Sequence, residues 1–123
     1  MGTDALRLLL RVFLEVEDEA RARDVLRSVI EPTLAPHAGL RDVTIERYWK
    51  MPEWFEITAD LDPLYDPMAV YDRLLALAEA GWTRSDDRSS RDAVWNPVSG
   101  ALLLAPEVRW AHLQLWLEES ATP

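Results

Sequence analysis

The chain has 123 residues, of which 49% are hydrophobic and 28% charged, and its 13 Lys+Arg against 22 Asp+Glu give a net charge of −9. This length is typical of one domain, so we expect residues 1–123 to fold together, and the six tryptophans exclude a disordered acidic tail. The negative charge opposes nucleic-acid binding, and the lack of cysteine excludes disulfides, thiolate nucleophiles and zinc fingers.

Targeting and membrane features are not expected. The N-terminus carries acidic Asp4 and has no basic region ahead of an apolar stretch, so it does not read as a signal peptide. Apolar runs such as residues 8–10 and 101–105 are far shorter than the roughly 20 residues that cross a bilayer. We therefore expect a cytoplasmic protein that has no membrane partner.

The first predicted elements are a strand and a helix. Residues 6–16 alternate between two faces, as a half-buried strand does, and the face with Leu8, Leu10 and Val12 is entirely apolar. Asp18 then provides a helix N-cap, and apolar residues follow at helical spacing up to Ile30. Proline at positions 32 and 36 is expected to end or kink this helix.

A hairpin and a second helix follow. Residues 43–51 and 55–62 alternate, and the turn Met51-Pro52-Glu53-Trp54 between them predicts an antiparallel pair. Asp66 and Pro67 have the residue types of an N-cap and a first helical position, and Gly81 is the expected stop of the helix.

The last third of the chain predicts further strands. Short strands are expected at 82–84 and 93–95 around a polar loop at 85–92, with a turn at 96–100. Periodicity cannot decide whether residues 101–105 form a helical turn or a strand. Residues 108–117 alternate, which predicts a last strand with Ala111, Leu113 and Leu115 toward the core.

The order strand, helix, strand, strand, helix, then additional C-terminal strands is that of an α+β ferredoxin-like sandwich. Two helices would cover one face of an antiparallel sheet. The opposite face would be solvated or available to a partner.

No residue pattern identifies a reaction. The two histidines, His37 in a loop between prolines and His112 within a strand, are expected to be surface or packed residues. The four glycines are far apart, which excludes the usual phosphate-binding loops. Carboxylates two residues apart could bind a divalent cation or act as acid and base, but they are more typical of a solvated strand face. We expect no enzyme, no cofactor and no metal.

The aromatic residues and carboxylates of the hairpin instead predict a partner-binding face. If the even-numbered residues of the hairpin point outward, an acidic surface with aromatic anchors results, which suits a basic protein partner. Because these carboxylates would be exposed, replacing them should leave stability nearly unchanged. The candidate residues are Glu46, Tyr48, Glu56, Thr58 and Asp60, with Phe13 and Glu15 from the first strand.

The segment from residue 81 to 117 resembles a known protein family. Trp95-Asn96-Pro97, followed by the run from Pro106 to Trp116, resembles the small acidic immunity proteins of bacterial polymorphic toxin systems. The resemblance implies a non-enzymatic inhibitor that binds a cognate toxin domain, often a basic nuclease, and blocks its active site or substrate groove. Binding faces in such families diverge greatly, so it transfers no individual residue.

Three alternatives remain at the level of sequence. One is a small enzyme that uses Asp and Glu chemistry, which the lack of a recognisable nucleophile opposes. The chain could be a small-molecule-sensing or regulatory domain of the ferredoxin-like type, with its ligand at a sheet face or a dimer interface. It could also be a homodimer in which the exposed sheet pairs with itself.

Overall fold

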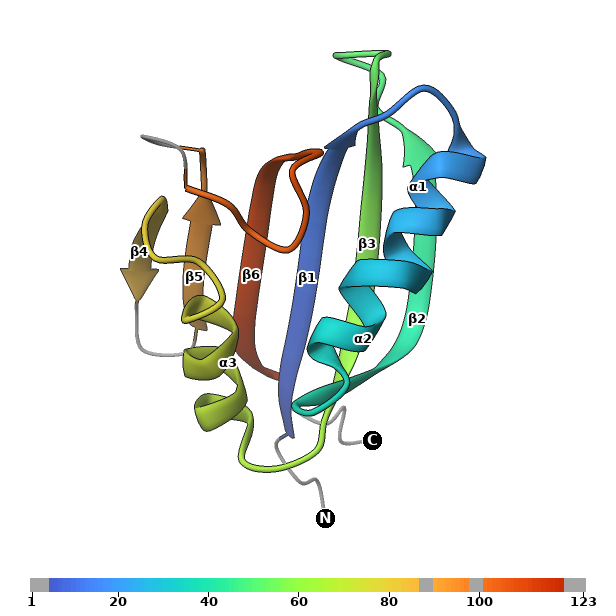
Figure 1. Ribbon diagram of the computed structural model, residues 1–123. Helices are drawn as coiled ribbons and strands as arrows, with labels where there is room; N and C mark the ends of the chain where they lie inside the picture. The colour runs from blue at the N-terminus through green and yellow to red at the C-terminus, as the bar shows by residue number, and fades with distance from the viewer. Residues whose placement is uncertain (1–4, 87–89, 98–100, 119–123) are drawn as a thin grey trace.

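The computed structural model describes residues 5–86, 90–97 and 101–118, and these contain a six-stranded sheet in which all neighbouring strands are antiparallel (Figure 1). The strand order is β2-β3-β1-β6-β5-β4. The strands are β1 (Ala5–Glu15), β2 (Ala38–Arg47), β3 (Trp54–Pro63), β4 (Trp82–Asp86), β5 (Ser90–Trp95) and β6 (Val108–Glu118). No helix among the described residues is long and apolar enough to cross a membrane.

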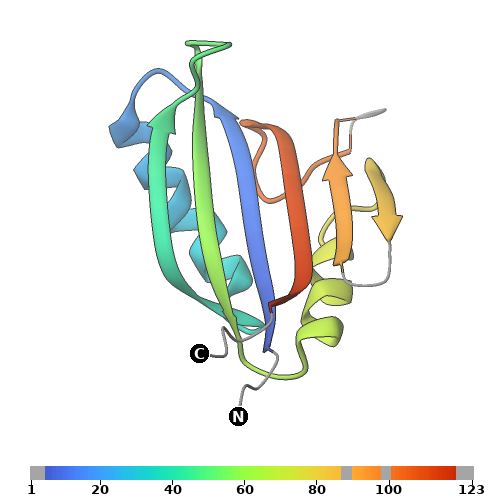
Figure 2. The ribbon, with the colours of Figure 1, turned by 180° about the vertical axis from the view of Figure 1, so that it is seen from behind.

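The helices cover one face of this sheet (Figure 1), and the view from behind shows no helix over the other face (Figure 2). One continuous helical segment consists of α1 (Glu19–Val25), the π-helical turn η1 (Leu26–Ile30) and α2 (Glu31–Leu34), and the second helix is α3 (Pro67–Leu75). The predicted α+β class with helices on one face is therefore confirmed. The sheet differs from the four strands of a simple ferredoxin-like sandwich in its number of strands and hence in its full strand order.

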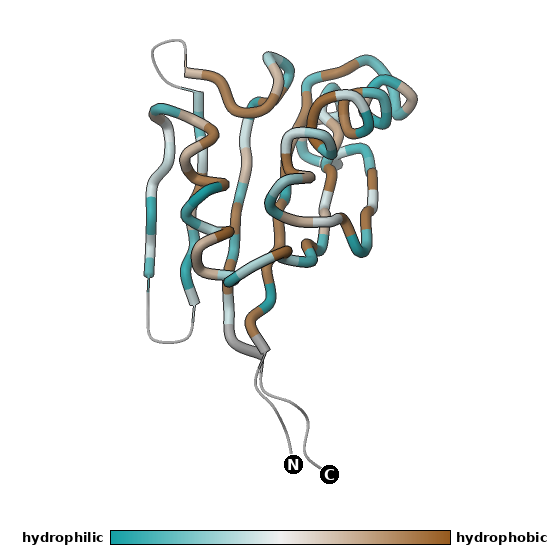
Figure 3. Tube along the Cα trace, turned by 60° about the horizontal axis from the view of Figure 1, so that its bottom comes forward, coloured by the Kyte–Doolittle hydropathy of each residue, from teal (hydrophilic) through white to brown (hydrophobic). Residues whose placement is uncertain are grey.

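The core lies between the helices and the sheet. Leu8, Leu10, Val12 and Leu14 of β1 are at most 4% exposed and face the helices, as their alternation predicts. The same alternation of apolar and polar residues along the strands is visible in Figure 3. The predicted inner face of β6 is also confirmed, because Ala111, Leu113 and Leu115 are all buried.

The first helix begins where the sequence predicts and ends later. Asp18 caps it by accepting a hydrogen bond from the backbone N–H of Arg21 at 2.8 Å. Pro32 neither ends nor interrupts the segment, which continues to Leu34. The turn before the proline is π-helical, and the N–H of Glu31 donates to the carbonyl of Leu26, five residues back. The wider turn accommodates a residue that has no N–H and whose ring crowds the preceding turn.

The hairpin is confirmed, but its first strand is shifted. β2 begins at Ala38 and ends at Arg47, so Lys50 and Met51 lie in the connecting turn. The pairing of β2 with β3 shifts register between Leu40 and Asp42. Because this irregularity interrupts the alternation of the two faces, the first half of the strand has no regular two-residue pattern in the sequence.

The second half of the chain follows the prediction less closely. Asp66 caps α3 by accepting from the N–H of Ala69, but the helix ends at Leu75, ahead of the expected stop at Gly81. The strands β4 and β5 are longer than predicted and form a hairpin. Residues 101–105 are neither helix nor extended strand, and contain an isolated bridge between Leu103 and Ala105. Part of the predicted polar loop (87–89) and of the predicted turn (98–100) lies outside the described residues.

Candidate functional site

The sheet face that no helix covers, called the open face below, brings five strands together in cross-strand rows (Figure 2). Residues directly opposite each other in antiparallel strands point to the same side of the sheet. The rows are Asp42–Asp60–Leu9–Gln114–Asp92, then Thr44–Thr58–Arg11–His112–Val94, then Glu46–Glu56–Phe13–Trp110. Tyr48 and Glu15 adjoin the third row, so the open face holds all seven candidate residues that the sequence predicts.

An aromatic cluster forms one end of the open face. The ring centroid of Phe13 lies 4.6 Å from Tyr48, 5.0 Å from Trp110 and 6.1 Å from Trp54. The expectation that Phe13 is exposed was wrong: these rings leave it only 6% exposed. Beside Tyr48, the side chain of Trp49 is 78% exposed in the hairpin turn. The cluster therefore presents tyrosine and tryptophan to the surface and uses phenylalanine as its base.

Two of the predicted carboxylates form ion pairs with arginines of the sheet. The Oδ2 atom of Asp60 lies 2.6 Å from Arg7 and 3.0 Å from Arg41, and the residue is only 9% exposed. The prediction that Asp60 faces solvent was therefore wrong, because arginines from strands on both sides enclose it. Glu56 is half-buried and accepts a hydrogen bond from Nε of Arg11 at 2.9 Å. These two carboxylates have their charges compensated within the sheet.

The acidic character available to a partner comes from other residues. Asp42 and Glu46 of β2 are exposed, and neither carboxylate has a hydrogen-bond or ion-pair partner in the part of the chain that the structure describes. Glu15 is exposed too, and it accepts a hydrogen bond from Nε of Arg109 at 2.9 Å. The edge strand β2 is therefore where uncompensated negative charge meets the open face.

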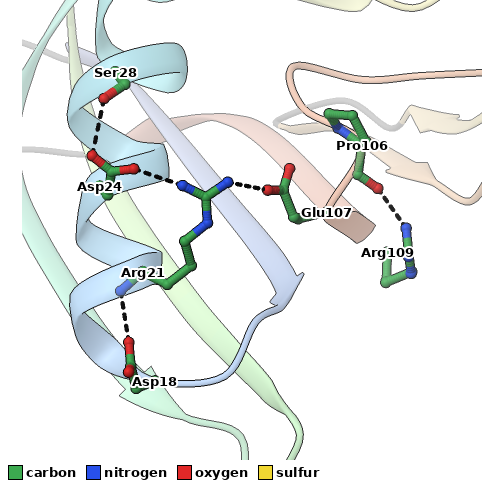
Figure 4. Close-up of polar contacts among 7 residues, drawn as sticks. All are labelled: Asp18, Arg21, Asp24, Ser28, Pro106, Glu107 and Arg109. Atoms are coloured by element: carbon green, nitrogen blue, oxygen red, sulfur yellow. Dashed lines mark hydrogen bonds and ion pairs between the residues drawn. The ribbon is translucent and has the colours of Figure 1, made fainter.

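The position of Glu15 depends on contacts that join α1 to the segment before β6 (Figure 4). The guanidinium of Arg21 lies 2.6 Å from Glu107, and the backbone N–H of Glu15 donates to the carbonyl of Glu107 at 2.9 Å. The hydrogen bond and charge of Glu107 raise the pKa of Arg21. These contacts fix the end of β1, from which Glu15 projects beside the aromatic cluster.

Both histidines have partners that the sequence could not reveal. Nε2 of His112 lies 2.8 Å from Oδ1 of Asp92, and this contact depends on the register between β5 and β6. Nδ1 of His37 lies 2.7 Å from the hydroxyl of Tyr65, beside a shallow pocket that Asp72 and Arg73 also line. The arginines of the open face do leave a signal in the sequence, since alternation puts Arg7 and Arg11 on the side of Phe13.

Across residues 5–86, 90–97 and 101–118, no three His, Asp or Glu side chains are grouped so that they could hold a metal ion. Comparison with known proteins found no matching protein family, no matching curated protein and no matching solved structure. A function for the open face therefore has to come from its own residues.

Proposed function

We propose that this protein is a cytoplasmic, non-enzymatic binding module of the immunity type, which uses its open face to hold and neutralise a basic partner protein such as a toxin domain. The observation that carries the proposal is the aromatic cluster around Phe13, which lies on a sheet face that no helix covers. Large aromatic side chains at a surface are the residues that most often anchor protein interfaces.

The composition of the open face supports a protein rather than a small ligand as the partner. Tyrosine, tryptophan and arginine are enriched in interfaces, and all three are present here on a rigid sheet. Ion pairs hold the side chains of Arg7, Arg11 and Asp60 in place, which reduces the entropy lost on binding. The apolar cavity that Leu10, Trp82 and neighbouring leucines line has about 10 Å³, space for no more than a water molecule. The larger pocket beside His37 and Tyr65, about 590 Å³, is shallow and is lined by none of the open-face residues.

The charge supports a basic partner. A net charge of −9, with unpaired carboxylates at Asp42 and Glu46, attracts a positively charged protein and raises the rate of association. The aromatic cluster would then slow dissociation, because buried aromatic contacts contribute most of the binding energy in typical interfaces.

The fold itself we propose to be an elaborated ferredoxin-like sandwich. The four adjacent strands β2-β3-β1-β6 would correspond to that fold, with β6 as the fourth strand. The hairpin of β4 and β5 would then be an insertion between α3 and the last strand, which extends the sheet at one edge. Support comes from the chain order of strand, helical segment, strand, strand and helix up to α3, and from the pairing of β6 with β1.

The test is capture of the partner by the immobilised protein from a lysate of the cells that encode it, at low and at moderate salt. Thr58→Arg places a long cation in the middle of the open face, and Ala20→Arg makes the same change on the exposed side of α1. We expect one basic protein that the wild type and Ala20→Arg retain, that Thr58→Arg loses, and whose retention falls as salt rises. Equal retention by the wild type and both variants, or retention of nothing, would refute the proposal.

A further inference from the structure

We infer that the partner binds as an extended strand along the free edge of β2, with basic side chains opposite Asp42 and Glu46. This inference rests on the proposed function and adds the place and the mode of recognition. In this mode the backbone ladder supplies affinity, while side chains at alternate positions supply specificity.

The edge of β2 is open to a further strand. β2 is the last strand at its side of the sheet (Figure 2). Most of its ten residues are exposed, including all of residues 41–44. An edge strand presents unpaired backbone N–H and C=O groups on its outer side. The opposite edge is β4, which has only five residues and offers half the ladder.

The charges of the two edges also favour β2 over β4. On β4, the carboxylate of Asp86 lies 3.6 Å from Arg84 and 3.5 Å from Arg91, so its charge is compensated. On β2, the carboxylates of Asp42 and Glu46 have no such partner among the described residues. The two arginines of this strand are directed elsewhere, because Arg41 is paired with Asp60. Arg47 donates to the carbonyl of Pro52 and lies over the ring of Phe55. Charge complementarity therefore favours β2 as the edge that receives a basic segment.

The spacing along β2 defines the segment. Asp42, Thr44 and Glu46 point to the open face, while Val43 and Ile45 point to the opposite side, and Val43 is 37% exposed. An added strand would have its own residues opposite these positions. The complementary sequence has lysine or arginine four positions apart, with apolar residues on the other side of the strand.

A second copy of this chain does not fit the edge. An isologous antiparallel pair that overlaps residues 42–46 in full is centred on Thr44, and this register places Asp42 of one copy opposite Glu46 of the other. Like charges directly opposite destabilise a sheet pair. The edge thus disfavours pairing with itself and favours a basic strand, which is how charged edges avoid aggregation.

The test uses a synthetic peptide of about seven residues, enough to span the edge, with lysines at the spacing of Asp42 and Glu46 and with threonine or valine elsewhere. A matched peptide has glutamate in place of each lysine. Both are titrated into the full-length protein and into the variant Asp42→Lys/Glu46→Lys, while backbone amide shifts are followed by NMR. The charged positions are exposed, so the variant is expected to keep the spectrum of a folded protein.

We expect the wild type to bind the lysine peptide at least about tenfold more tightly than the glutamate peptide, and the variant to reverse this preference. The amide shifts should concentrate in residues 42–47. Shifts confined to the aromatic cluster, or no preference between the peptides, would overturn the edge inference. The proposed function would stand in that case if the wild type still captures a basic partner that Thr58→Arg loses. It would fail if nothing is captured or if Thr58→Arg has no effect on the capture.

Discussion

At the scale of single residues, Asp60 differs most from its expected role. Its carboxylate lies between Arg7 and Arg41 and is nearly inaccessible to solvent, so it stabilises the sheet rather than contacting a partner directly. Neutralising it would leave two arginines without the charge that holds them together. The expectation that such a change is without cost therefore no longer applies to this residue.

We predict that Asp60→Asn lowers the free energy of unfolding by about 1.5–3 kcal/mol, the typical value of hydrogen bonds to charged groups. The matched control is Glu46→Gln, where the carboxylate is exposed and the change should stay within about 0.5 kcal/mol. Urea unfolding at neutral pH measures both. Equal stability of the two variants would show that the arginine contacts of Asp60 contribute nothing.

Tyr71 offers a test of burial on the helix side. It is fully buried in α3, and its hydroxyl has no hydrogen-bond partner among the described residues. Burial raises the pKa of Tyr71 above its ordinary value of 10.0, although the nearby charge of Arg84 acts in the opposite direction. Tyr71→Phe removes the unsatisfied hydroxyl, so at pH 7 it should leave stability unchanged or raise it by about 1 kcal/mol.

The pH dependence of this variant follows from the direction of the shift. Above pH 10 the unfolded chain loses the Tyr71 proton while the folded protein retains it, so the free energy of unfolding falls as pH rises toward the folded pKa. Phenylalanine has no such proton. The advantage of Tyr71→Phe over the wild type should therefore grow between pH 7 and about pH 10.5 in urea unfolding. A constant difference would contradict the raised pKa.

At the scale of elements, the junction between α3 and β4 depends on one glycine. Gly81 has φ +112°, and a Cβ atom at this position would lie 2.5 Å from the carbonyl oxygen of Asn96 and from Nε1 of Trp95. That indole donates to the carbonyl of Ala80 at 2.8 Å, so the tryptophan cannot move away without losing its hydrogen bond.

Gly81→Ala should therefore lower the free energy of unfolding by about 2–4 kcal/mol, from backbone strain and overpacking together. Gly39→Ala is the matched control, because a Cβ there meets nothing within 4 Å and φ lies in the ordinary range. We expect that control to be neutral or to stabilise by up to about 1 kcal/mol. Thermal unfolding of the two variants compares them directly, and a similar loss in both would refute the close approach at Gly81.

What the sequence could predict was the regular part of each element. Alternation predicted β1 and β6, and residue types at Asp18 and Asp66 predicted both helix starts. Two boundaries were wrong where the backbone is irregular: the π-helical turn before Pro32 and the register shift after Leu40. Neither irregularity leaves a periodic trace in the sequence, because a π-helical turn and a register shift each add a residue to the regular repeat.

For the candidate site, the sequence could predict which residues share a face but not which of them are buried. Alternation predicted which residues share a face, and the structure brings all seven candidates onto the open face. It could not predict that Asp60 is enclosed or that Phe13 is covered, because both depend on side chains from neighbouring strands. Burial on a sheet is a property of cross-strand neighbours, and their register is not encoded in any one strand.

At the scale of the whole molecule, the two sides of the sheet have different roles. The helices bury one side of the sheet, and the other side is held by internal ion pairs and an aromatic cluster. The uncompensated carboxylates lie at its β2 edge. A basic protein approaching this molecule would be attracted by the net charge and would find its contacts on the side that no helix covers.

The most direct test of binding at the open face is oxidative footprinting of the tryptophan side chains, with and without the captured basic partner. Trp49 and Trp110 lie at the hairpin turn and on the open face, whereas Trp82 contacts the apolar cavity on the helix side and is the internal reference. We expect the partner to protect Trp49 and Trp110 and to leave the oxidation of Trp82 unchanged. Protection of Trp82 alone, or unchanged oxidation of all three, would contradict binding at the open face.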